Sequence, residues 1–191
     1  MPTTPHLDQL KQIHELNRGF LGLLQTRARA RRDCLGLPAA VVPAMRVASE
    51  PLLDALAEFP RALFDLEIAG SSRLGSERRE RVGVDEAEHD LCLSILLAAR
   101  QASRQSAYQA RLLFGLATPA LKHLCALRLP EVQRLAGHSA LLRCAFFERL
   151  WFWQGLLAAT RPESRRQLTL MALQPGAVLE WPQRRPPQSS V

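Results

Sequence analysis

The 191 residues suffice for one domain or two small ones, and a content of 47% hydrophobic and 23% charged residues indicates a globular chain. A formal net charge of +7, carried almost entirely by arginine, is compatible with a nucleic-acid or other anionic partner. The longest apolar stretch, residues 140–159, is interrupted by charged side chains, which excludes a membrane span there.

The cysteines are widely spaced and form no C-x-x-C pair, which argues against a zinc ribbon. They are Cys34, Cys92, Cys125 and Cys144. The polar start of the chain does not resemble a signal peptide. We therefore expect a cytoplasmic protein that does not associate with membranes.

An internal repeat of about 79 residues is indicated by an ungapped match of Gly36 with Gly115. The same shift pairs Pro51 with Pro130 and several apolar residues. These further identities are Leu37 with Leu116, Leu56 with Leu135, Ala57 with Ala136 and Leu63 with Leu142. An amphipathic helix precedes each glycine, so the repeat predicts two similar helical units.

The first unit begins with apolar residues at helical spacing over Leu7–Thr26, broken only by Asn17. A short helix is expected within Ala39–Val47, and a helix capped by Ser49 is expected to follow. Residues 60–68 fit a helix or a strand, and we favour a helix.

The second unit follows a polar, Gly/Ser-rich linker. Helices are predicted over Val84–Gln109, from Thr118 to Leu127, and from Pro130 to a stop at Gly137. A last long helix is predicted over Ser139–Ala159, with one more helical turn or a strand at residues 168–173 and a mobile tail from Glu180.

The predicted fold is all-α, with two similar helical units packed as an internal pseudo-dimer. The expected segments are a first unit at 6–68, a linker at 69–84, a second unit at 85–147, and an extension with an aromatic helix and flexible tail at 148–191. A unit of this size buries little core alone, so packing two apolar faces together removes more surface from water.

Motifs for catalysis are absent from the sequence: it has no phosphate-binding glycine loop, nucleophile elbow or H-E-x-x-H helix. His89 and Cys92 lie one helical turn apart, and His123 is near Cys125, but tetrahedral zinc needs four ligands. We expect a binding protein with no catalytic residues, no metal site and no cofactor.

Candidate DNA contacts lie on the two short helices of the second unit, which are spaced like a helix-turn-helix or an ordinary helical corner. Cations there can contact phosphate, and Gln and Arg can reach base edges. The first unit instead carries Glu50, Asp54 and Glu58, which would repel phosphate. A run of arginines after the first helix is a second candidate, or simply a solvated helix end. The DNA-binding candidates are Lys122, Arg128, Gln133, Arg134, His138, Arg27, Arg29, Arg31 and Arg32.

The last long helix is rich in aromatic residues that either dock a partner protein or pack across the two units. Aromatic residues dominate binding energy where they lie in interfaces. The partner-binding candidates are Phe147, Trp151, Phe152 and Trp153.

Two stretches of the chain resemble the FlhD family, the smaller subunit of the bacterial flagellar master activator. The family pattern is a helix of the form I-x-E-L-N-x-x-Y/F-L-x-L-A-Q, then R-L-G with an apolar residue, then A-L-S/T-P/L-x-Q-x-x-K-L-A. The first stretch matches in residues 13–17, 20–25, 35–37 and 48–57, and the second in residues 90–98, 114–116, 126–130 and 133–136.

The resemblance implies an all-helical, dimeric fold that joins a zinc-bearing FlhC-like protein to bind promoter DNA, with further self-association possible. Two units in one chain then imply a fused dimer. The family's inter-subunit cysteine would fall near Phe64 and Arg143, and only Cys144 comes close. We expect a DNA-binding transcription regulator subunit; the alternative is a helical adaptor or decoy that binds only proteins, such as a secretion accessory factor.

Overall fold

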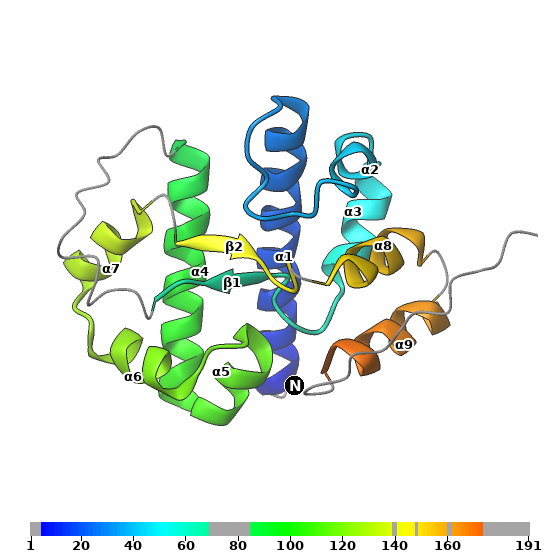
Figure 1. The fold of residues 1–191 in the computed structure, drawn as a ribbon. Helices are drawn as coiled ribbons and strands as arrows, with labels where there is room; N and C mark the ends of the chain where they lie inside the picture. Colours follow the sequence, from blue (N-terminus) through cyan, green and yellow to red (C-terminus); the bar gives the residue numbers. More distant parts are fainter. Residues whose placement is uncertain (1–4, 69–84, 139–140, 148, 160–161, 174–191) are drawn as a thin grey trace, which may run out of the picture.

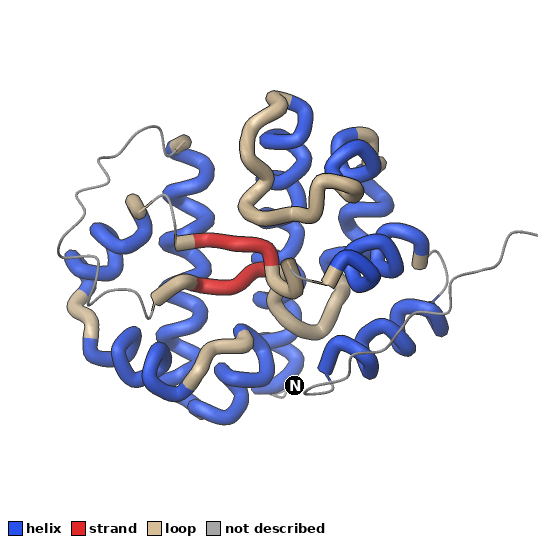
Figure 2. The backbone as a smooth tube through the Cα atoms, viewed as in Figure 1, coloured by secondary structure: helices blue, strands red, loops and turns tan. Residues whose placement is uncertain are grey.

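The computed structural model describes residues 5–68, 85–138, 141–147, 149–159 and 162–173. In these residues the chain is mainly helical, with one short two-stranded sheet (Figures 1 and 2). The long helices α1 (Pro5–Arg29) and α4 (Glu86–Gln105) pack against each other in the middle of the molecule. The predicted linker at 69–84 and the predicted tail lie outside the described residues.

The first half surrounds α1 with α2 (Val42–Arg46) and α3 (Glu50–Ala57), both of which contact it. The Ser49 hydroxyl accepts a hydrogen bond from the Leu52 N–H at 3.4 Å and so caps α3. The three predicted helices of this half are therefore confirmed.

The second half surrounds α4 with α5 (Ala107–Phe114), α6 (Thr118–Ala126) and α7 (Leu129–Ala136). The helix predicted over Val84–Gln109 is shorter, because Ser106 is extended and caps α5 instead of continuing α4. The two short helices before Gly137 are confirmed, although α6 has Ala117 at its N-cap position.

The prediction of a helix at residues 60–68 is wrong, because this segment contains strand β1 (Phe64–Leu66). It pairs antiparallel with β2 (Leu142–Cys144), which places Asp65 opposite Arg143. Residues 60–68 alternate in a way that suits either structure, and the choice is made by a partner strand far away in the sequence.

The single helix predicted over Ser139–Ala159 is also wrong. Backbone N–H groups in β2 and just after it bond to the first half: Cys144 to the Leu35 carbonyl at 2.7 Å and Ala145 to the Leu63 carbonyl at 2.9 Å. Phe146 then adopts a left-handed φ of 56°, which interrupts any helix. Helix α8 (Leu150–Ala158) starts after this turn, and α9 (Pro162–Leu173) follows it.

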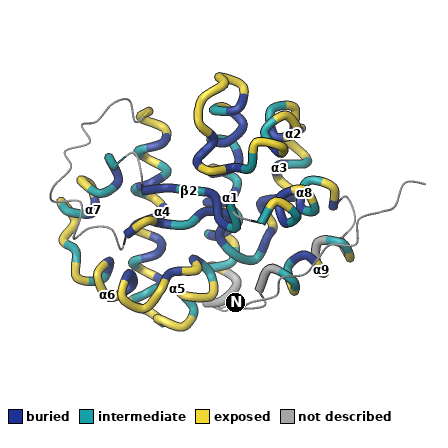
Figure 3. The backbone as a smooth tube through the Cα atoms, in the orientation of Figure 1, coloured by how far each residue is buried: buried dark blue, intermediate teal, exposed yellow. Residues whose placement is uncertain are grey.

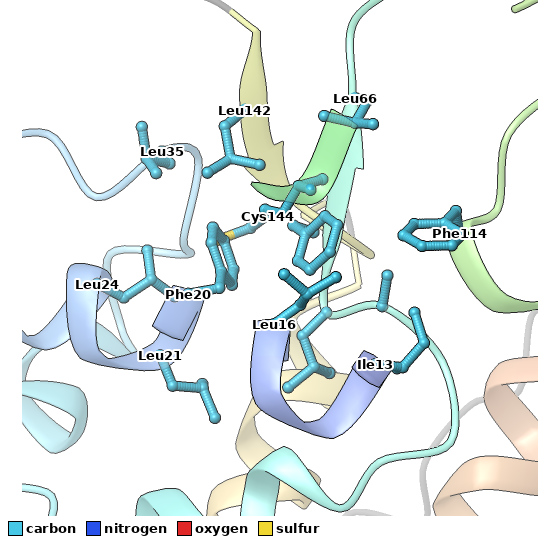
Figure 4. Packing of buried hydrophobic residues seen from close by; sticks show 14 of the residues in the cluster. Ile13, Leu16, Phe20, Leu21, Leu24, Leu35, Leu66, Phe114, Leu142 and Cys144 are labelled. Atoms are coloured by element: carbon cyan, nitrogen blue, oxygen red, sulfur yellow. The ribbon is translucent and has the colours of Figure 1, made fainter. Parts of the chain in front are cut away.

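A single hydrophobic core joins the two halves (Figure 3). Ile13, Leu16, Phe20 and Leu24 form the buried face of α1, and this face meets Leu66, Leu142 and Cys144 of the sheet (Figure 4). The Phe20 and Phe64 rings pack edge to face at 5.6 Å. The sheet is therefore built from one strand of each half over the central helix.

Gly36 and Gly115, the residues that anchor the predicted repeat, both have left-handed φ angles, 80° and 68°. Such angles favour glycine, which has no Cβ to clash. At Gly115 a Cβ would also lie 2.1 Å from Arg61 Nη2. In the described residues, no helix is long and apolar enough to cross a membrane.

Candidate nucleic-acid interface

The outer surface of α6 and α7 carries most of the predicted DNA contacts. Both helices bury an apolar side against α4, including Leu121 and Leu124 of α6 and Val132 of α7. Their remaining positions point away from the core, and Figure 3 shows their outer turns as exposed. Among the predicted residues, Lys122, Arg128, Gln133 and Arg134 are exposed, and His138 is half-buried.

Local chemistry sets where these helices begin. Pro119 and Pro130 each lie in a first turn, where a missing N–H costs no helical hydrogen bond. The Arg128 N–H donates to the Glu131 carboxylate at 2.6 Å, which ties the extended connection to the start of α7. The Arg128 backbone is thereby fixed at the corner between the two helices, and its side chain is exposed there.

Three cations on this surface are not neutralised by the part of the chain that the structure describes. Lys122, Arg128 and Arg134 form no ion pair with any described residue, although Arg134 Nε makes a long contact of 3.4 Å with the Pro130 carbonyl. A positive surface with uncompensated charge attracts anions at long range, and its attraction weakens with salt.

The corresponding helix of the first half has the opposite character. Glu50 and Asp54 of α3 both accept hydrogen bonds from Arg18 of α1, with Arg18 Nε 2.5 Å from the Asp54 carboxylate. These bonds, the one to Asp54 first, raise the pKa of the Arg18 guanidinium. Two carboxylates share one guanidinium, so this cluster keeps a net negative charge and offers no favourable site for phosphate.

The arginine run after α1 divides into structural and exposed members. Arg27 pairs with the buried Glu88 of α4 and donates to the Asp33 carbonyl at 3.0 Å. Arg29 donates to the Arg46 carbonyl at 3.2 Å. Arg29, Arg31 and Arg32 are all exposed, so only Arg27 is withdrawn from the accessible cations of the run.

The predicted partner-binding aromatics also divide. Phe152 and Trp153 of α8 are fully buried, and Trp153 Nε1 donates to the Ala145 carbonyl at 2.9 Å. These two side chains pack within the core and present no surface to a partner. Phe147 and Trp151 stay half-exposed, and the Arg143 guanidinium carbon lies 3.2 Å from the centroid of the Phe147 ring.

The structure also buries polar groups that were not among the predicted site residues. Arg61 and Asp65 are both partly buried: desolvation lowers the pKa of Arg61, with Asp65 opposing, and raises that of Asp65, with Arg61 and Arg143 opposing. Asn17 is fully buried. The sequence signals this buried residue only through its position, a polar side chain in an otherwise apolar helical stripe.

The histidines and cysteines do not assemble into a metal site within the described part of the chain. Cys34, Cys92 and Cys144 are buried free thiols, and burial raises the pKa of Cys92 to about 12. A thiol with so high a pKa is a poor nucleophile and a poor metal ligand.

Comparison with known protein families, curated proteins and solved structures found no match to this chain.

Proposed function

We propose that this chain is a non-catalytic, DNA-binding subunit of a cytoplasmic transcription regulator, and that α6 and α7 supply its DNA contacts. The observation that carries the proposal is the contrast between two corresponding surfaces. On α3 the acids are present and paired with Arg18, whereas on α6 and α7 the exposed cations lack an ion-pair partner among the described residues. Phosphate contacts of this kind provide affinity, and Gln133 and Arg134 offer base-reading chemistry.

The same proposal includes an internal pseudo-dimer. Helices α3 and α7 coincide when the chain is shifted by the repeat length of about 79 residues, and each packs on the long helix of its half. The strands β1 and β2 occupy nearly equivalent positions and pair antiparallel around Asp65 and Arg143. A two-fold axis relating two units produces this kind of self-complementary pairing.

The resemblance to the FlhD family supports a regulator acting with an FlhC-like partner. The places where the resemblance puts an inter-subunit cysteine, near Phe64 and Arg143, both lie in the strands that join the two halves. A fused dimer would bring those positions together. The proposed targets are promoters, including flagellar ones.

Replacing both Arg128 and Arg134 with alanine is expected to weaken binding to promoter DNA about tenfold and to lower the salt slope of the affinity by about 1.8, because two phosphate contacts are lost. Titration at two salt concentrations, with and without an FlhC-like protein, measures both quantities. Lys11→Ala is the control, since it removes an exposed cation from α1. An unchanged affinity and slope would remove this surface from the proposal.

A helical adaptor that binds only proteins is the second candidate, and one observation favours it. Shifting Arg18 and Glu50 by the repeat length leads to Leu97 and Leu129, which are 38% and 51% exposed. An ion-paired surface in the first half thus corresponds to exposed apolar residues in the second, as at a protein contact. A chain that binds an FlhC-like protein but no duplex DNA at low salt would favour the adaptor.

A further inference from the structure

The charges of the two halves are distributed very differently. Residues 5–68 contain eight acidic and eight basic residues, so this half is formally neutral. The segment from Leu91 to Pro130 contains no aspartate or glutamate at all. Its cations are Arg100, Arg104, Arg111, Lys122 and Arg128. An acid-free stretch of this length covers most of α4, all of α5 and all of α6.

The helix α5 brings part of this charge to the surface next to α6. It contacts both α4 and α6, and the three form the lower left edge of the molecule in Figure 1. Ala110 and Phe114 are buried. Arg104, at the end of α4, and Arg111 of α5 are exposed and form no ion pair with a described residue.

The exposed side of α5 also carries an aromatic residue. Tyr108 is 69% exposed and lies one helical turn from Arg111 and from Leu112, which is itself 50% exposed. A tyrosine hydroxyl can donate to phosphate, and Arg111, one turn further along α5, supplies a positive charge beside it.

We infer that the end of α4 and the outer side of α5 form a second phosphate-binding surface, made by Arg104, Tyr108 and Arg111, which extends the DNA contact of α6 and α7. The inference rests on the proposed function, because the ligand is the backbone of the same duplex. Charge selects this partner. Residues 91–130 contain no carboxylate, and Asp8 and Glu15 of α1 line a groove with Gln101 and Gln105 on the α1 side of α4, so the outer side of α5 is the part of this surface that attracts a polyanion. The residues contribute affinity and not sequence preference, since they contact phosphate.

The test uses the full chain and a duplex of about 20 base pairs, with affinity measured at about 50 mM and about 200 mM salt. Removing two phosphate contacts lowers the salt slope by about 1.8. Between the two salt concentrations, the factor by which the affinity of Arg104→Gln/Arg111→Gln falls should therefore be about tenfold smaller than the factor for wild type. Tyr108→Phe should weaken binding severalfold without changing the slope. Arg18→Gln, which removes a charge from the side of α1 that faces α3, should change neither quantity. Thermal unfolding verifies that each variant is folded.

Parallel measurement of Arg128→Gln/Arg134→Gln separates this inference from the proposed function. If only the latter pair changes the slope, the α5 surface is refuted and the α6–α7 surface stands. If only the Arg104 and Arg111 pair changes the slope, the α6–α7 surface is refuted and the α5 surface stands. A wild-type chain that binds no duplex at the lower salt concentration overturns both, as does a chain that binds only anionic phosphatidylserine vesicles.

Discussion

Asn17→Ala is expected to lower the free energy of unfolding by about 3–5 kcal/mol, because several buried backbone groups would lose their hydrogen-bond partner. The Asn17 amide nitrogen lies 3.0–3.3 Å from the carbonyl oxygens of Ala57, Phe59 and Arg61. Its amide oxygen accepts from the Leu63 N–H at 2.8 Å. One side chain on α1 thus satisfies backbone hydrogen-bonding groups along the connection between α3 and β1. Chemical denaturation followed by far-UV circular dichroism measures the loss.

Asn17→Leu separates hydrogen bonding from packing. Leucine fills a similar volume and is the residue at position 96, which the predicted repeat pairs with Asn17. Because leucine cannot bond to the connection, we expect it to destabilise the protein about as much as alanine does. A leucine variant as stable as wild type would show that the site requires only volume.

Arg27→Ala is expected to destabilise the fold by about 3–5 kcal/mol, the usual result of leaving one member of a buried ion pair without its partner. The Glu88 side chain is 4% exposed and that of Arg27 is 19% exposed, and the pair joins α1 to α4. Thermal and urea unfolding of Arg27→Ala and Glu88→Ala provide the measurement.

The double variant Arg27→Met/Glu88→Leu is the matched control. Replacing both charges with apolar side chains of similar size removes the desolvation cost together with the attraction, so its stability should be close to that of wild type. A double variant as unstable as the sum of the two single variants would contradict a direct coupling between these residues.

Local signals in the sequence predicted the helices well. Ser49 with Pro51, and the prolines at 119 and 130, mark helix starts through capping and first-turn chemistry that involve only nearby residues. The strands were missed because β1 and β2 are three residues each and lie about 78 residues apart. Each is specified by the other, and a short apolar segment has no local preference strong enough to reveal it.

For the candidate interface, too, the features set by nearby residues were predicted and those set by distant contacts were not. Polar side chains on the outer faces of amphipathic α6 and α7 were expected to be exposed, and Lys122, Arg128, Gln133 and Arg134 are. Arg27 looked like one of a run of solvated cations, yet its partner, Glu88, is 61 residues away. Phe152 and Trp153 are buried because α8 folds back on α3, a tertiary contact that helical periodicity does not encode.

The most direct test of the central claim, that the second half contacts DNA, is an arginine footprint on the intact chain. An arginine-selective dicarbonyl reagent, read by mass spectrometry with and without duplex DNA, reports the accessibility of each guanidinium. DNA should slow modification of Arg128 and Arg134, and of Arg104 and Arg111, while leaving Arg18 and Arg46 unchanged. Protection confined to the first half, or equal protection of all arginines, would contradict the claim.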